Sequence, residues 1–419
     1  MAADPASTGQ ARAVADTAAR AAYGRLIAFL SARNRDVAAA EDALADAFIA
    51  ALETWPERGI PERPEAWLLS VARRRTIDRA RRDARAGAAM PDLVLRIEEA
   101  EMAANAESSA FPDDRLKLLF ICAHPAIAAP VRTPLMLQTV FGFDAARIAG
   151  AFLTAPTAMG QRLVRAKSKI RATRPGFAEP GRPDWPDRLG AVLSAIYAAY
   201  TAGWDDPAGL DGPRSGFARE AIVLGRMTAA LLPDEGEAHG LLALMLHCEA
   251  RKPARRSAAG DFIPLSLQDA GLWDRTLIAE AETALRRALE CGPPGRFAIE
   301  AAIQSGHAVR LVREAPDWDA ITRLYDLLVT VTPALGAQIA RAAALGESRG
   351  AEAGLTALDR IDPERVRDYQ PWWATRAHLL AEAGRRDEAR DTYRRAAGLT
   401  TDPAVRNWLL ARGRDALSP

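Results

Sequence analysis

The hydrophobic pattern of residues 13–85 predicts three helices. Apolar side chains recur about one helical turn apart in two runs. The runs comprise Tyr23, Leu26, Ile27 and Leu30, and then Leu44, Phe48, Ile49, Leu52 and Trp55. Three prolines between residues 56 and 65 do not fit a helix interior, so they separate the second helix from the third. We expect the third helix to start near Pro64 and to run through Trp67 into an arginine cluster that begins at Arg73.

Residues 113–175 end in the pattern of a helix-turn-helix. A helix over 133–140 is broken by Phe-Gly-Phe, and Asp144 can cap the next helix by accepting a hydrogen bond from an exposed amide. Pro156 suits the start of a third helix. That helix is predicted to bury one apolar stripe and to expose a polar, basic face. The stripe comprises Met159, Leu163, Ala166 and Ile170, and the exposed face Gln161, Arg165 and Ser168, flanked by Arg162 and Lys169.

The segments outside these two units differ in composition. Residues 1–12 are expected to form a flexible N-terminus, and residues 86–112, which are rich in small and acidic residues, a solvated linker. Prolines at positions 175, 180, 183 and 186 mark a boundary before residues 176–419.

Residues 176–419 carry an approximate repeat of 34 or 35 residues. Leu324, Leu358 and Tyr393 occupy one repeat position, and Leu327, Ile361 and Ala396 another. A weaker copy ends with Ala281, Leu285, Ala288 and Pro293. Small residues at fixed places let paired helices approach closely, which is typical of helical repeats. The last copy has the spacing of a tetratricopeptide (TPR) helix pair, at Trp373, Ala377, Leu380, Gly384, Ala389, Tyr393 and Ala396.

Composition supports an all-α protein with localised positive charge. Alanine, leucine and arginine recur throughout, and aromatic residues make up 6%. The formal net charge is +1, yet residues 73–85 hold seven arginines against two acids, and residues 162–174 hold six basic residues and no acid. Two basic helices in a near-neutral chain indicate contact with a polyanion at those places, although a solvated amphipathic face is the alternative for residues 73–82.

Catalytic and metal-binding motifs are not evident in the sequence. Cys122, Cys248 and Cys291 are too scattered for a disulfide framework or a zinc site, and we expect Cys122 and the pair His247-Cys248 to lie in the core. The chain contains no HExxH, phosphate-binding loop or GxSxG sequence, so we predict no enzyme, cofactor or metal. The absence of a signal peptide and of a membrane-length apolar run predicts a soluble, cytoplasmic protein without a membrane partner.

Several stretches resemble the extracytoplasmic-function (ECF) sigma factors of bacterial RNA polymerase. They read AEDALADAFIAALETWP, RPEAWLLSVARRRTIDRARR, DDRLKLLFICAHPAI, IAGAFLTAPTAMGQRLVRAKSKIR and AVLSAIYAAYTAGW. The resemblance implies sigma region 2 over residues 13–85, sigma region 4 over residues 113–175 and, as in one subgroup, a TPR-like C-terminal extension. Ala45 and Asp46 stand where the family often has glutamine and glutamate, and residues 201–204 read Thr-Ala-Gly-Trp in place of Asn-Glu-Gly-Tyr.

The resemblance implies roles for particular residues. Polymerase docking falls to Glu41, Asp42, Asp46 and Phe48. Capture of the promoter −10 element falls to the loop 56–64 and the third helix, with Arg58, Arg63, Trp67, Arg73, Arg74, Arg81 and Arg82. Reading of the −35 element falls to Thr157, Gln161, Arg162, Arg165, Lys167 and Lys169. From the residues alone, the acids near position 41 complement the helix dipole or form a protein-docking face.

The expected partners are core RNA polymerase and promoter DNA. The C-terminal repeats would be regulatory, through a protein partner or an intramolecular contact with the sigma domains. Two alternatives remain open, namely a DNA-binding transcription regulator and a TPR scaffold, neither of which engages polymerase.

Overall fold

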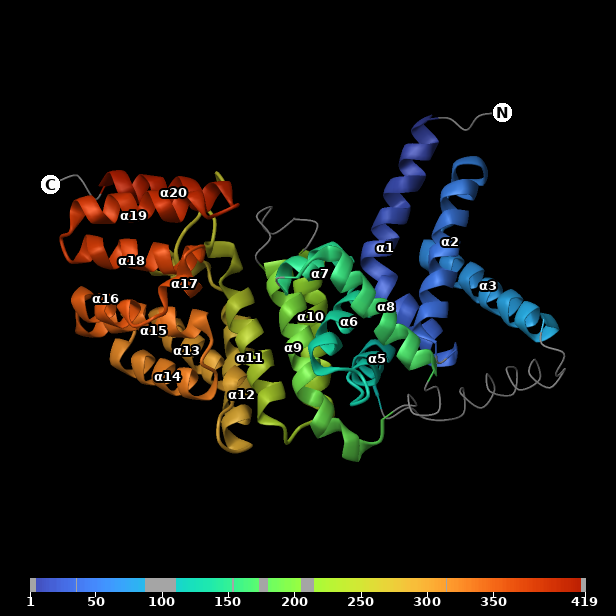
Figure 1. The fold of residues 1–419 in the computed structure, drawn as a ribbon, viewed down its shortest axis with the longest axis horizontal. Coiled ribbons are helices and arrows are strands. Elements are labelled where there is room, and N and C mark those ends of the chain that lie inside the picture. Colours follow the sequence, from blue (N-terminus) through green and yellow to red (C-terminus); the bar gives the residue numbers. More distant parts are fainter. Residues whose placement is uncertain are drawn as a thin grey trace. The chain divides into compact units, whose positions relative to one another are not determined.

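The computed structural model describes residues 5–34, 36–86, 111–152, 154–172, 180–204 and 215–415. It divides into two compact units, residues 1–203 with 216–231 and residues 204–215 with 232–419. Helices make up both units (Figure 1), and the described residues contain no strand, only an isolated bridge between Arg256 and Phe262. The predicted all-α class is therefore confirmed.

A hairpin of two long helices opens the first unit, α1 (Pro5–Asn34) and α2 (Val37–Arg58). The sequence predicts a flexible segment over residues 1–12, but α1 already begins at Pro5. Small residues explain the difference, because alanines line the buried side of both helices and let them pack closely. The buried alanines are Ala11, Ala15, Ala18 and Ala22 on α1, and Ala40, Ala43, Ala47 and Ala51 on α2.

The turn between α2 and α3 (Pro64–Ala86) is shorter than predicted. Pro56 lies inside the last turn of α2, where a proline removes a single hydrogen bond and the Gly59 N–H still closes the turn on the Trp55 carbonyl at 3.0 Å. Gly59 has φ +86°, and Pro64 occupies the first position of α3, as predicted. The rings of Trp55 and Trp67 meet edge to face at 5.5 Å and join the two helices.

The predicted helix-turn-helix elements are present in the first unit. They are α6 (Ala129–Thr139), which begins four residues before the predicted helix, α7 (Ala145–Ala151) and α8 (Pro156–Ala172). They follow α5 (Asp114–Cys122), a helix that was not predicted from the sequence. Asp144 caps α7 by accepting a hydrogen bond from the Arg147 N–H at 2.7 Å, as expected. Gly142, with φ +71°, ends the preceding helix. The stripe Met159, Leu163, Ala166 and Ile170 is buried, which confirms the predicted phase of α8.

Two helices of the predicted C-terminal extension belong to the first unit, α9 (Trp185–Trp204) and α10 (Ser215–Leu231). Trp185 packs against Phe111 and Phe120, with ring centroids 5.0 and 6.0 Å apart, and the buried Arg188 donates a hydrogen bond to the Phe120 carbonyl at 3.0 Å. The prolines near residue 176 therefore do not separate the compact units. The first turn of α9 therefore packs against α5.

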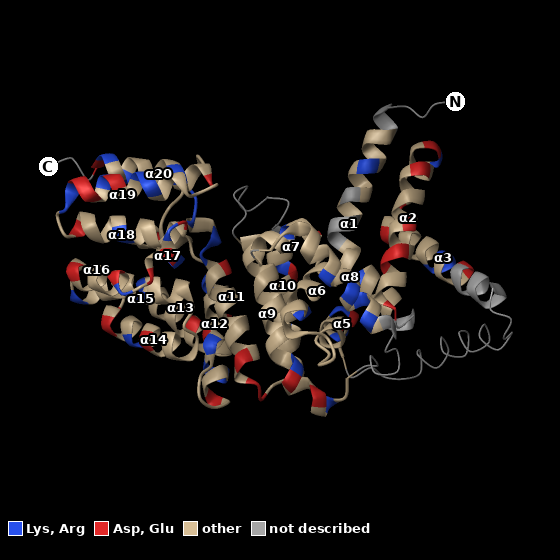
Figure 2. Ribbon diagram, viewed as in Figure 1, with Lys and Arg blue, Asp and Glu red and all other residues tan. Residues whose placement is uncertain are grey.

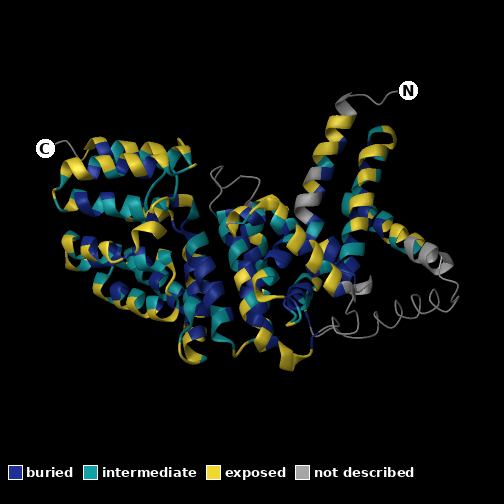
Figure 3. Cartoon of the chain, viewed as in Figure 1, coloured by how far each residue is buried: buried dark blue, intermediate teal, exposed yellow. Residues whose placement is uncertain are grey.

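The second unit is a series of helices in which each packs against its neighbours along the chain (Figure 1). They are α11 (Gly236–Ala250), α12 (Arg275–Glu290), α13 (Arg296–Ala308), α14 (Trp318–Val331), α15 (Leu335–Arg349), α16 (Ala351–Asp359), α17 (Pro363–Val366), α18 (Gln370–Glu382), α19 (Arg386–Gly398) and α20 (Pro403–Asp415). Most of these helices bury one side and expose the other, whereas α11 has no exposed residue between Gly236 and Ala250 (Figure 3).

The last predicted repeat copy corresponds to the pair α18–α19. Ala377 and Leu380 of α18 and Ala389, Tyr393 and Ala396 of α19 are buried, and Gly384 turns the chain between them with φ +74°. The earlier copies are less regular: Ile361 and Ala396 are buried, but Leu327 at the same repeat position is 40% exposed. The repeat therefore drifts in phase along the second unit.

Replacing Gly240 by alanine tests the close crossing of α11 and α13. A Cβ at this position would lie 2.5 Å from the backbone nitrogen of Ala298. Alanine favours a helix over glycine by about 1 kcal/mol, but overpacking against backbone costs about 1–3 kcal/mol, so we expect a net loss of stability in chemical denaturation. Gly398→Ala is the matched control, because nothing lies within 4 Å of its Cβ position. Equal stability of the two variants would contradict this packing.

Candidate nucleic-acid and polymerase interface

The exposed face of α8 carries most of the residues predicted to read DNA. Thr157, Gln161, Arg162, Arg165 and Lys169 are all exposed, and the Lys and Arg positions of this helix are blue in Figure 2. The Arg165 Nε donates a hydrogen bond to the Gln161 carbonyl at 3.3 Å. The face is polar, cationic and continuous from the first turn of α8.

Val164 is a member of this face that the sequence analysis missed. Its side chain is 64% exposed, although it follows the buried Leu163 directly. At about 100° per residue it falls on the same side as Thr157 and Ser168. The phase of the buried stripe would have revealed it.

Lys167 does not lie on the exposed face of α8. Its Nζ lies 2.5 Å from Oε2 of Glu41 on α2, and the two side chains are only 13% and 17% exposed. The structure thus brings together a residue predicted to bind DNA and a residue predicted to bind polymerase. Burial raises the pKa of the Glu41 carboxyl, and the neighbouring Lys167 ammonium opposes that rise.

The surroundings of this ion pair are apolar or hydrogen-bonded. Burial, with a smaller effect of the Glu41 charge, raises the pKa of the Tyr23 hydroxyl. Burial raises the pKa of the Cys122 thiol to about 12, and its Sγ lies 3.6 Å from Oγ1 of Thr139. Cys122 is therefore a buried core residue, as predicted, and is protonated at neutral pH.

The outward face of α2 differs from the predicted docking set. Asp42 and Asp46 are exposed, Phe48 is half-buried, and Glu41 is turned into the pair with Lys167. Ile49 and Leu52, expected in the core, are 55% and 45% exposed. The alanine stripe takes much of the buried side of α2, and these two large side chains are exposed one to two turns beyond Asp46. We call Asp42, Asp46, Ile49 and Leu52 the α2 outer face.

The turn between α2 and α3 and the start of α3 form a third exposed region. Arg58, Arg63, Arg73 and Arg74 are exposed, and Trp67 is half-buried against Trp55. Arg81 and Arg82 lie on the helical backbone of α3, but their side chains are outside the described part of the structure.

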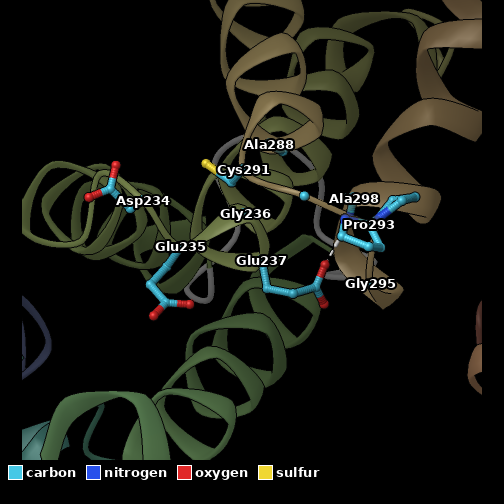
Figure 4. A pocket seen from close by; sticks show the side chains of 11 residues that line it. Asp234, Glu235, Gly236, Glu237, Ala288, Cys291, Pro293, Gly295 and Ala298 are labelled. Atoms are coloured by element: carbon cyan, nitrogen blue, oxygen red, sulfur yellow. Dashed lines mark hydrogen bonds between the residues drawn. The ribbon is translucent and has the colours of Figure 1, made fainter. Parts of the chain in front are cut away.

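A polar pocket in the second unit offers no comparable chemistry (Figure 4). Asp234, Glu235, Cys291 and Gly295 are among its lining residues. The carboxylate of Glu237, which also lines it, accepts hydrogen bonds of 3.0 Å from the backbone amides of Phe297 and Ala298. This carboxylate caps α13, so its role is structural.

Trp204, which departs from the family pattern, and His247 both have structural roles in the second unit. The Trp204 indole N–H donates to the Cys248 carbonyl at 3.4 Å, and the Arg255 guanidinium lies over its ring at 3.6 Å. His247 is buried, and burial, together with the charge of Arg251, lowers its pKa to about 4. His247 is thus a neutral core residue at physiological pH, in line with the expectation for the His247-Cys248 pair.

Comparison with known proteins bears on both units. The sigma-70 region 2 family matches residues 19–86, which span most of α1 and all of α2 and α3. A family of unknown function, DUF6596, matches residues 188–289. No solved structure gives a significant match to the chain. Within the described residues, no helix combines the length and apolar character needed to cross a membrane.

A full-length relative extends the comparison to both units. The uncharacterized protein R00370 of Rhizobium meliloti (strain 1021) is 36% identical over 384 residues, which cover 91% of this chain and 90% of that protein. The match to region 2 confirms the N-terminal domain predicted from the sequence. The chain belongs to the same family as this Rhizobium protein, and its sigma-70 region 2 domain supports its assignment as a sigma-70-type factor.

Proposed function

We propose that this chain binds core RNA polymerase as an ECF-type sigma factor and directs initiation at a specific set of promoters. One observation carries the proposal: a sigma-70 region 2 domain shares a compact unit with a helix-turn-helix whose basic face is exposed. The polymerase supplies the chemistry, so the chain acts without a catalytic residue or cofactor, in the cytoplasm where transcription occurs.

The −35 element would be read by α8 in the major groove. Gln161 can pair with adenine and Arg165 with guanine, each through two hydrogen bonds, and the methyl groups of Val164 can contact the methyl group of thymine. Arg162 and Lys169, at one edge of the face, suit phosphate contacts that set the position of the helix.

The −10 element would be opened at the α2–α3 turn. Each unstacked DNA step loses about 1.4 kcal/mol of stacking. A base held at the turn, with Arg58 and Arg63 beside it and Trp67 at the start of α3, offsets that loss through stacking and charge. Arg73 and Arg74 would bind the phosphates of the separated strand.

The second unit would regulate these contacts. We propose that its helix pairs are TPR-like and that they bind a protein partner or the sigma domains. Run-off transcription with purified core polymerase and the full chain tests the function as a whole. No promoter-dependent transcript would favour a DNA-binding regulator or a scaffold that does not engage polymerase.

Truncating the exposed apolar side chains of the α2 outer face should weaken polymerase binding. Each of Ile49→Ala and Leu52→Ala is expected to reduce the affinity for core polymerase about tenfold, a loss of ~1.4 kcal/mol. Stability should change little because both side chains are exposed. A fluorescence titration measures the affinity. Leu410→Ala, which removes an exposed leucine from α20, is the control. Unchanged affinity for both α2 variants would contradict this docking face.

Replacing Gln161 or Arg165 by alanine should relax sequence discrimination. We expect a loss of about 1–3 kcal/mol on the preferred −35 duplex for each variant, with little change on unrelated duplexes. Binding is measured over a range of salt concentrations. Arg219→Ala on α10 removes an exposed arginine of the same unit as the control. An equal loss on every duplex, with a shallower salt dependence, would instead assign a phosphate contact.

A further inference from the structure

A long loop in the second unit, residues 251–274, joins α11 to α12, and we call it the strap. In a helical-repeat protein each helix contacts its neighbours along the chain, so the fold itself does not require the first pair to meet the last helix. The strap departs from this rule, because Arg256 and Phe262 reach α20 at the end of the series (Figure 1). Insertions in such repeats often map to the binding face. The strap is thus a candidate ligand of α20 from within the same chain.

The strap tip, residues 256–262, forms a small hairpin. The amides of Ser257 and Ile263 donate backbone hydrogen bonds of 2.9 Å across it. These bonds lie on either side of the bridged pair Arg256 and Phe262. Because directly opposed residues of an antiparallel pair point to the same side, the two side chains leave the hairpin together. The tip therefore presents a cation beside an aromatic ring, and its own backbone fixes their spacing.

Two side-chain contacts join the strap tip to α20. Nη2 of Arg256 lies 2.5 Å from Oδ2 of Asp402, and the two side chains are 24% and 19% exposed. The rings of Phe262 and Trp408 meet edge to face at 5.8 Å, and both residues are half-buried. Oδ1 of Asp402 accepts hydrogen bonds from two backbone amides in the first turn of α20. Asp402 thus uses one oxygen to cap its helix and offers the other to the strap.

The parts of the strap on either side of the tip are held by other contacts. Arg255 donates to the Trp204 carbonyl at 2.7 Å, and Trp273 is buried. Arg310 donates to three strap carbonyls, those of Leu265, Ser266 and Gln268. None of these contacts involves α20, so the tip can leave α20 while both flanking parts of the strap stay in place.

Resting on the regulatory role proposed for the second unit, we propose that α20 carries a docking site for a partner protein at Asp402 and Trp408. The strap tip occupies this site as an intramolecular ligand. The partner presents an arginine beside an aromatic side chain, since these are the groups that the site binds here. A short tether gives the tip an effective concentration in the range of about 1 mM, so the partner must bind more tightly than the tip does. Docking of the partner and release of the tip are then one event.

A peptide with the sequence of residues 254–264 tests the site. The full chain carrying Arg256→Ala and Phe262→Ala has an emptied site, and the labelled peptide is titrated with it by fluorescence anisotropy. We expect saturable binding, and binding at least tenfold weaker to the wild-type chain, whose own tip competes. The same peptide with alanine at both positions should not bind. No saturable binding to an emptied chain with normal circular dichroism would overturn the proposal.

Asp402→Asn in the emptied chain tests which group accepts the arginine. Asparagine still caps a helix, but it carries no charge to pair with Arg256. We expect peptide binding to weaken at least tenfold. Asp391→Asn on α19 is the matched control, because it removes a carboxylate that is 62% exposed in the same unit, and it should leave binding unchanged. Equal binding by the two variants would show that Asp402 does not form the site.

Hydrogen exchange gives a second measurement that does not depend on the emptied chain. Asp402→Asn alone should release the tip and speed exchange at the amides of Ser257 and Ile263, while the amides of α18 and α19 keep their protection. Unchanged exchange at the two strap amides would contradict a releasable tip. Neither measurement involves polymerase. A failure of run-off transcription therefore counts against the proposed function, and a failure of the peptide to bind counts against the docking site.

Discussion

Close packing of helices through alanine and glycine is the constraint on which this structure depends. Alanines line the contact between α1 and α2, Gly24 admits the Val140 carbonyl, and Gly240 admits the backbone of α13. On α2 these alanines share the buried side with Leu44 and Trp55, and they leave less of that side to other large apolar residues. Ile49 and Leu52 are exposed on the other side of α2, where they form part of the proposed docking face.

Some of the basic residues are paired within the fold, and others are exposed on the surface. The basic segment at residues 251–256 is engaged within the second unit: Arg251 donates to Gln304, and Arg256 pairs with Asp402 at 2.5 Å. The basic face of α8 and the start of α3 remain exposed. A chain of net charge +1 can therefore bind a polyanion at selected places.

The placement of α9 and α10 links the two parts of the chain. Both helices pack within the first unit, and the covalent connections to the second unit start from them. Arg147 of α7 donates to the Ala202 carbonyl at 3.2 Å and lies 4.8 Å from the centre of the Phe217 ring. Arg147 thereby joins α7 to both α9 and α10 within the first unit. A chain ending near residue 175 would lose this packing and expose Phe111 and Phe120.

Local signals in the sequence were sufficient for the last two helices of the helix-turn-helix and for the exposed basic face of α8. Asp144, Pro156 and the stripe from Met159 to Ile170 act within one or two helical turns, and the structure bears out all three. The basic helices and the last helix pair of the second unit are equally readable, because helix caps and periodicity depend on near neighbours.

Only the tertiary structure decided which sides of the helices meet. The pattern that placed Ile49 and Leu52 in the core was ambiguous, since alanines fit closer contacts than large side chains do. Nothing local relates Glu41 to Lys167, or Gly24 to Val140, across more than a hundred residues. These contacts result from long-range packing within the first unit, and they turn a predicted DNA contact and a predicted docking residue into one ion pair.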